Sequence, residues 1–189
     1  MTNQGKGAID IVLADSFKEL AATKPIEKIT IKEITDRAGV IRPTFYNHFQ
    51  DKYELLEWIV ENELVAPSMP IFENGMFKEG AVFILTRMEK EKDFYKKAAA
   101  LEGQNSFKEI LQHSIARMIV KFMDVNKLMK MIHCSWMTPE LLAEFYGSTI
   151  CASVIKWINT NMHTPIDETV DAFTFLFTNS IVDLMKKTL

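Results

Sequence analysis

Apolar residues recur along this chain at intervals of three and four, which is the period of one face of an α-helix. The first clear case spans residues 8–22, where polar residues lie mostly outside an apolar stripe made of Ile9, Leu13, Ser16, Phe17 and Leu20. This helix should end before Pro25. The alternation typical of a half-buried strand is hard to find, so the pattern predicts an all-α protein.

A second, shorter helix is predicted over residues 30–39 by its end signals. Thr30 can cap the N-terminus, and Glu33 stands three residues later, as in a capping box. Ile31 and Ile34 then face inward, and Gly39 can adopt the left-handed conformation that ends a helix.

The next stretch, RPTFYNHF at residues 42–49, crowds polar side chains between two phenylalanines. Two short helices joined by a tight turn fit a helix-turn-helix, in which Phe45 and Phe49 anchor the second helix and its other face points outward. Ile41 cannot accept hydrogen bonds as a cap, and Pro43 disfavours helical geometry at the residue before it. We therefore expect this helix to begin at Pro43, with Arg42 at the cap position.

These polar side chains are of the types that contact DNA. Arg42 can bridge guanine O6 and N7, Thr44 and Tyr46 can bind phosphate or a thymine methyl, and His48 and Lys52 can donate to the backbone. Other interpretations remain open: a packing role for Tyr46, a solvated surface position for His48 and a plain surface charge for Lys52. The predicted DNA-binding residues are Thr30, Arg42, Pro43, Thr44, Tyr46, Asn47, His48 and Lys52.

A connecting helix should follow, with Asp51 as its cap, and the prolines at 67 and 70 mark the clearest boundary. The sequence thus predicts a helix-turn-helix domain over 1–52, a connecting helix over 52–65 and a helical domain over 66–189. In the latter, helices are expected over 77–101, 106–134 with a break near Asp124, 139–162 and 166–187. The last two start with Thr as cap and Pro at the first helical position.

Composition changes this picture little. The chain has 189 residues, 48% of them hydrophobic, and a formal net charge of −3. Residues 1–52 hold 8 Lys/Arg against 7 Asp/Glu, a net of +1. We find no secretory signal and no apolar run long enough for a membrane span, and we expect a cytoplasmic protein with buried, free thiols at Cys134 and Cys151.

The N-terminal part of the chain, residues 17–55, resembles the DNA-binding region of the TetR family of bacterial transcription regulators. In that family a helix ending in Phe is followed by the pattern T-x-x-x-I-A-x-x-A-G-V-S-x-x-T-F/L-Y-x-H/Y-F-x-x-K-x-x-L. The matching residues are Phe17, Thr30, Ile34, Ala38, Gly39, Val40, Thr44, Phe45, Tyr46, His48, Phe49, Lys52 and Leu55. Two positions depart from the pattern. Thr35 replaces a small alanine, so either the two helices cross at a slightly wider distance or the Thr35 hydroxyl bonds back to the preceding turn. Ile41 replaces the usual serine cap.

The resemblance implies a C-terminal domain that dimerises and often holds a small apolar effector. Residues 141–158 carry an apolar stripe too wide for one side of a surface helix, and 171–185 supply aromatic partners for it. Two such helices packed against a two-fold copy would form a four-helix bundle. The expected dimerisation residues are Phe145, Thr149, Ser153, Trp157, Phe173, Phe177 and Ile181.

The stretch YGSTICASVIKWINTNMHTPIDET, residues 146–169, is similar to a subgroup typified by an activator of dihydroxyacetone-kinase genes. That subgroup implies a partner protein as an alternative to a small effector. If there is a pocket, its expected residues are Tyr95, His113, His133 and Trp136, although Met and aromatic stripes are more often plain core.

The sequence therefore predicts a homodimeric regulator on a palindromic DNA operator, controlled by an effector or partner protein, with no cofactor and no metal. His133 and Cys134 are adjacent and diverge on a helix, and Glu109 with His113 lacks further ligands. One rival is an interaction module with a vestigial DNA-binding head. The other rival is a helical enzyme, but the sequence lacks nucleotide-binding, nucleophile-elbow and metalloprotease motifs.

Overall fold

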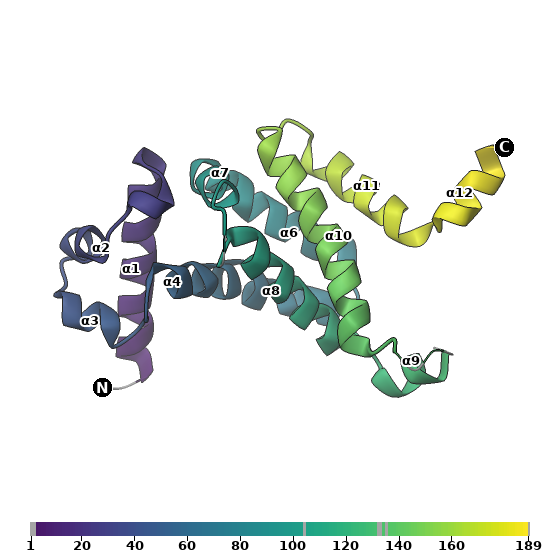
Figure 1. The fold of residues 1–189 in the computed structure, drawn as a ribbon, viewed down its shortest axis with the longest axis horizontal. Helices are drawn as coiled ribbons and strands as arrows, with labels where there is room; N and C mark the ends of the chain where they lie inside the picture. The colour runs from purple at the N-terminus through teal and green to yellow at the C-terminus, as the bar shows by residue number, and fades with distance from the viewer. Residues whose placement is uncertain (1–2, 104, 132–133, 135, 189) are drawn as a thin grey trace.

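In the computed structural model, which describes residues 3–103, 105–131, 134 and 136–188, every regular element is helical. The molecule is elongated, with the N-terminal helices at one end and the C-terminal helix projecting from the other (Figure 1). The helices are α1 (Asn3–Thr23), α2 (Ile31–Ala38), α3 (Arg42–Tyr46), α4 (Lys52–Ile59), α5 (Ala66–Glu73), α6 (Phe77–Lys90), α7 (Lys92–Ala99), α8 (Phe107–Phe122), α9 (Val125–Met131), α10 (Pro139–Asn159), α11 (Ile166–Thr178) and α12 (Ile181–Thr188), with a 3₁₀ turn at Ile26–Lys28 and a π-helical turn at Val60–Val65.

Helices α1, α2 and α3 form a small head around one end of α4. The predicted capping box is confirmed, because the Thr30 hydroxyl accepts from the Glu33 N–H and the Glu33 carboxylate accepts from the Thr30 N–H. Gly39 ends α2 with a φ of 68° in the left-handed region. Thr35 is buried, and its hydroxyl donates to the carbonyls of Ile31 and Lys32 at 3.0 Å, as expected for this departure from the family pattern.

The connecting helix does not end before the two prolines, because α4 continues through the π-helical turn into α5. Proline lacks an N–H and would leave a carbonyl of the preceding turn without its donor. Here the Glu63 carbonyl, four residues before Pro67, accepts from Arg87 Nε at 3.1 Å, and the Val65 carbonyl accepts from the Ser68 hydroxyl at 2.7 Å. The connecting helix is therefore longer than predicted and runs unbroken to Glu73. The division into domains over 1–52 and 66–189 stays a prediction.

Helices α6 to α12 form the body of the molecule, and they are shorter than the helices predicted from the sequence. Glu91 separates α6 from α7, and Asn179 and Ser180 separate α11 from α12 within ranges expected to be single helices. The break near Asp124 is confirmed. Thr138 caps α10 as predicted, accepting from the Leu141 N–H at 3.1 Å. Helix α11 begins at residue 166 as predicted, but Pro165 occupies the cap position instead of Thr164, and no side chain caps the helix.

Helix α10 packs along α8 at the centre of the body. A Cβ added at Gly147 would lie 3.2 Å from the Gln112 carbonyl oxygen, so the small residue there serves contact within the chain. By length and a mean hydropathy of 1.2, α10 is the one described helix that could cross a membrane. Core helices of globular proteins meet the same criterion, and one side of α10 lies against α8.

Candidate nucleic-acid interface

Helix α3 is held from one side and presents its other side to solvent. Phe45 is fully buried and Phe49 is 4% exposed, and their ring centroids lie 5.8 Å apart. This confirms the two aromatic anchors. On the outer side Arg42, Pro43, Tyr46 and Asn47 are exposed and Thr44 is half-buried.

The start of α3 differs by one residue from the prediction. The helix begins at Arg42, and Ile41 occupies the cap position with extended backbone and no side-chain cap bond. The Thr44 N–H donates to the Ile41 carbonyl at 2.9 Å, so a backbone bond closes the first turn where a side-chain acceptor is missing.

Arg42 and Tyr46 lie together on this outer face. Arg42 Nη2 donates to the Tyr46 hydroxyl at 3.0 Å, and the guanidinium lies 5.5 Å from the centre of the ring. Tyr46 is 48% exposed, and its ring packs edge-on against Phe45 at a centroid distance of 5.7 Å, so the half-buried packing role left open for it also agrees with the structure. The pairing restrains a long, exposed side chain and so reduces the conformational entropy that it could still lose on binding a ligand.

His48 and Lys52 are placed differently from the prediction. The His48 side chain is 4% exposed, and its Nδ1 lies 2.6 Å from Asp10 Oδ1 on α1. Lys52 Nζ donates to the carbonyls of Ile26, Glu27 and Ile29 at 2.9, 2.7 and 2.9 Å. An ammonium has three N–H donors, so all of them are used. The expectation that these two groups are free for phosphate, and the surface alternatives for both, are wrong.

These contacts give both residues a structural task. His48 ties the end of the α3 region to α1, and Lys52 holds the 3₁₀ turn Ile26–Lys28 between α1 and α2. Partial burial lowers the pKa of Lys52. Neither contact could be found from the local pattern, because the partners lie 23 to 38 residues away.

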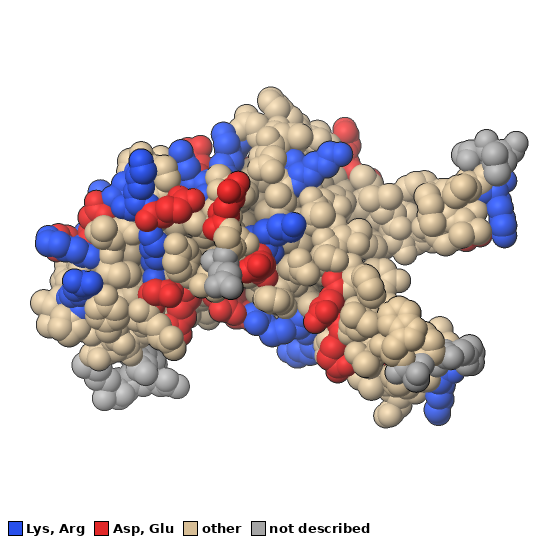
Figure 2. All heavy atoms as spheres, in the orientation of Figure 1, with Lys and Arg blue, Asp and Glu red and all other residues tan. Residues whose placement is uncertain are grey.

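Thr30 is exposed at the N-terminus of α2 and remains a candidate for phosphate, although its hydroxyl already bonds with Glu33. Glu33 also pairs with Lys24, and these bonds lower the pKa of the Glu33 carboxyl to about 2. Acids neutralise other cations of the head, as in Arg37 with Glu19. Figure 2 shows Lys/Arg and Asp/Glu side chains intermixed over this end of the molecule, so charge density does not mark it as a nucleic-acid surface, and the candidate site is defined by the polar face of α3.

Comparison with known proteins agrees with this geometry. Residues 15–59 match the profile of bacterial regulatory proteins of the tetR family, and residues 76–179 match a transcriptional regulator C-terminal region. The chain belongs to the TetR family. It is 23% identical over 141 residues to the HTH-type dhaKLM operon transcriptional activator DhaS of Lactococcus lactis subsp. lactis (strain IL1403), covering 75% of this chain and 74% of the relative.

Two solved structures share the fold of this TetR-family regulator. One is the dihydroxyacetone kinase operon activator DhaS, with a TM-score of 0.59 and 20% identity over 89% of this chain and 93% of that one. The other is NalD, the secondary repressor of the MexAB-OprM multidrug efflux pump in Pseudomonas aeruginosa, with a TM-score of 0.54 and 15% identity over 90% and 93%. The resemblance of the sequence to the family and to the dihydroxyacetone-kinase activators is thereby confirmed.

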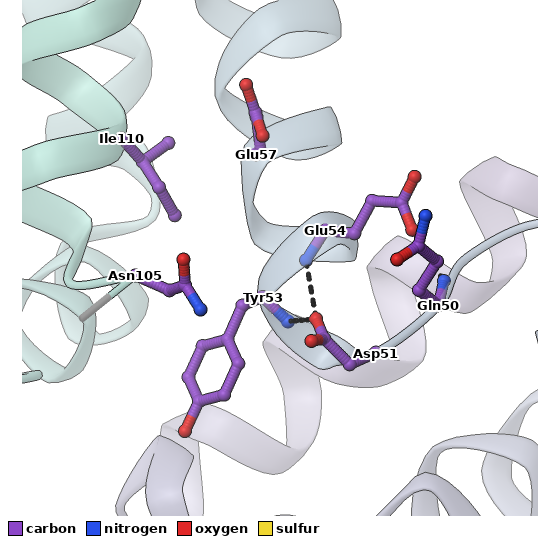
Figure 3. Close-up of a pocket in the computed structure, with 7 residues that line it drawn as sticks. All are labelled: Gln50, Asp51, Tyr53, Glu54, Glu57, Asn105 and Ile110. Atoms are coloured by element: carbon purple, nitrogen blue, oxygen red, sulfur yellow. Dashed lines mark hydrogen bonds between the residues drawn. The ribbon is translucent and has the colours of Figure 1, made fainter.

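A polar pocket of about 350 Å³ lies where the head meets the body of this regulator (Figure 3). Its carboxylates already have partners: Asp51 accepts from the N–H groups of Tyr53 and Glu54, and Glu57 pairs with Arg117. Among the described residues, no group of three or more His, Cys, Asp or Glu side chains is placed to hold a metal ion. The pocket is lined by Gln50, Asp51, Tyr53, Glu54, Glu57, Asn105 and Ile110.

A larger cavity of about 690 Å³ lies in the body between α6, α8, α10 and α11, and its lining is almost wholly apolar. Phe72, Ala81, Leu85, Met88, Leu111, Ile115, Met118, Phe122, Val154, Phe173 and Phe177 are among the lining residues. None of the predicted pocket residues that the structure describes is among them. The stripe of 111, 115, 118 and 122 along α8 is the sequence signal that could have located it.

The predicted pocket residues lie elsewhere for identifiable reasons. Tyr95 is 1% exposed and packs against Phe94 and Phe107, and its burial raises the pKa of the phenol well above its usual range. His113 is exposed, Trp136 is 62% exposed, and His133 lies outside the described residues. Of the two thiols, Cys151 is buried as expected, with its pKa raised to about 11 by burial, whereas Cys134 is half-buried.

The expected dimerisation residues divide into three groups. Phe145 and Ile181 are 54% and 70% exposed, and Thr149 is exposed as well. Ser153, Phe173 and Phe177 are half-buried, and the two phenylalanines line the cavity. Trp157 is 4% exposed, and its Nε1 donates to the Thr164 carbonyl at 3.0 Å. The expectation for Trp157 is wrong, because this side chain is buried within its own chain.

Proposed function

We propose that this chain is a sequence-specific DNA-binding transcriptional regulator that acts as a homodimer on a palindromic operator, and that an apolar effector in the body controls it. Because operator DNA lies in the bacterial cytoplasm, the regulator would act there, and none of these steps requires an enzymatic reaction. The observation that carries the proposal is α3, which is anchored by Phe45 and Phe49 and turns its polar side outward. The side chains offered to DNA are Thr30, Arg42, Pro43, Thr44, Tyr46 and Asn47.

Exposed apolar side chains support the homodimer. They follow α10, α11 and the projecting α12, and a monomer would leave them in water: Phe145, Tyr146, Phe175, Leu176, Ile181, Val182 and Met185. A two-fold copy would cover the same surface on both chains. It would also set two α3 helices at the spacing of successive major grooves, roughly 34–36 Å.

The apolar cavity supports an effector. A volume of about 690 Å³ falls in the range of small-molecule sites, and the lining favours an apolar compound. The relatives named above are an activator and a repressor. A ligand shifts an equilibrium only when it binds the two states with different affinity. Whether the effector switches transcription on or off would depend on which distance between the two DNA-binding heads it stabilises.

Selection of bound duplexes from a random pool tests DNA recognition and the dimer together. We expect a motif with two-fold symmetry, which only a symmetric pair of heads would select. Arg42→Ala should then weaken binding to this motif about 10- to 100-fold, the effect of one good base contact, and change binding to scrambled duplex far less. Lys121→Ala, an exposed substitution on the distant α8, is the control. Equal affinity of the wild-type protein for recovered and scrambled duplexes would refute the operator.

Binding of N-phenyl-1-naphthylamine, a neutral fluorescent probe, tests the cavity. Its emission should rise and saturate at about one probe per chain, because apolar surface leaves water on binding. Ala81→Phe places a ring among the lining residues and should weaken probe binding about tenfold or more, whereas Ala22→Phe, on the exposed side of α1, should not. If Ala81→Phe binds the probe as well as wild type does, the cavity is not the site.

A further inference from the structure

Lys18 on α1 connects the head to the body. Its Nζ lies 2.8 Å from both carboxylate oxygens of Glu63, 3.0 Å from Glu91 Oε1 and 3.3 Å from Asp15 Oδ1. Glu63 belongs to the π-helical turn, and Glu91 stands at the break between α6 and α7. The Lys18 side chain is only 12% exposed, so solvent and salt screen these contacts less than those of a surface pair.

The π-helical turn contacts both the head and the cavity. The Glu63 side chain holds Lys18, while the next two residues, Leu64 and Val65, line the cavity and are 1% and 8% exposed. The Glu63 carbonyl accepts from Arg87 of α6, a helix that also lines the cavity. Turns of this kind are rare, occur mostly as single turns inside α-helices and are frequent at functional sites.

The charges around Lys18 are not balanced. One cation faces three carboxylates, Asp15, Glu63 and Glu91, which gives +1 − 3 = −2 for the cluster. Glu91 Oε2 is buried and has no hydrogen-bond partner among the described residues. An unpaired carboxylate oxygen is costly when buried, so the two glutamates compete for the same ammonium. Lys18 contacts both glutamates, so a displacement of α6 or of the π-helical turn would change the contacts that hold it.

We propose that Lys18 is the positioning residue that sets the orientation of the DNA-reading head, and that the π-helical turn Val60–Val65 transmits changes in the cavity to it. The inference rests on the proposed function, since it names how the cavity controls the head. Filling the cavity displaces Leu64, Val65 and α6. Glu63 and Glu91 move with them, and Lys18 carries the displacement into α1.

Amide hydrogen exchange of α1, measured without DNA, tests the connection. Two perturbations of the cavity are used separately: the Ala81→Phe substitution and bound N-phenyl-1-naphthylamine. Each should change exchange of residues 8–23 about fivefold or more in the wild-type background, a typical size for coupling between sites. In Lys18→Met the change should disappear from α1 and persist in α6, whereas Lys18→Arg and the control Lys121→Met should retain it.

This cycle separates coupling from stability, because each perturbation is compared with its own unperturbed background. The proposal is overturned if α1 does not respond to either perturbation, or if Lys18→Met responds as wild type does. Loss of the response at α6 as well as at α1 would show that Lys18 is merely structural, and would also overturn it.

A second measurement uses the selected duplex and a duplex with one half-site. Lys18→Met should lower affinity for the full site about tenfold, because two misplaced heads cannot bind together, and leave single half-site affinity unchanged. An equal loss on both duplexes counts against the positioning role. Failure of wild type to prefer any duplex would refute the proposed function, while the exchange cycle still decides the coupling.

Discussion

Replacing Lys52 with methionine should lower the free energy of unfolding by about 3 kcal/mol, since hydrogen bonds to a charged group each contribute roughly 1.5–3 kcal/mol and are not additive. The substitution keeps most of the side-chain volume but removes all three donors, two to the 3₁₀ turn Ile26–Lys28 and one to its C-cap residue Ile29. The carbonyls of Ile26 and Ile29 would lose their bonds to Nζ beside fully or almost fully buried side chains. Urea denaturation followed by circular dichroism measures the effect.

Lys28→Met is the matched control, because Lys28 is exposed in the same turn and its loss should change stability by less than about 0.5 kcal/mol. DNA binding separates the two roles of Lys52. If Lys52 is structural, folded Lys52→Met protein retains most of its affinity for DNA. A variant with wild-type stability that binds every duplex more weakly would restore the phosphate contact originally predicted for this residue.

The head was predictable where its contacts are local. The Thr30–Glu33 capping box, the left-handed Gly39 and the Asp51 cap each involve residues within four positions of one another, so the sequence displays both partners. Phe45 and Phe49 were predictable as anchors because their spacing places them on one face. His48 and Lys52 were misassigned because their partners, Asp10 and the 3₁₀ turn, come from other elements.

The body shows the same division between local and distant contacts. Pro67 predicted a boundary by a sound local rule, but Arg87 from α6 supplies the donor that allows the helix to continue. The cavity is a matter of shape, which residue type alone does not reveal. The polar and aromatic residues predicted for the pocket, such as Tyr95, lie in the core or on the surface. Aliphatic, methionine and phenylalanine side chains enclose the cavity instead.

Phe45→Ala should have the largest effect, a loss of about 4 kcal/mol in the free energy of unfolding, because large-to-small changes of a buried phenylalanine typically cost 3–5 kcal/mol. Phe45 is fully buried and contacts the rings of Tyr46 and Phe49 at centroid distances of 5.7 and 5.8 Å. Helix α3 has only five residues and cannot persist without tertiary contacts. Removing this anchor should therefore release the surface that reads DNA.

The loss should fall unevenly over the molecule. The ring centroids of Trp58 and Phe49 lie 6.2 Å apart, so Trp58 fluorescence reports on the head when Trp136 and Trp157 are replaced by phenylalanine. Binding of N-phenyl-1-naphthylamine reports on the body. In Phe45→Ala we expect an altered Trp58 signal and loss of the operator preference, with probe binding retained, because local unfolding costs less than global unfolding. Phe45→Leu, which keeps most of the apolar volume, should retain measurable operator binding. If Phe45→Ala bound the operator as wild type does, α3 would not depend on this anchor, and recognition would have to be sought elsewhere on the chain.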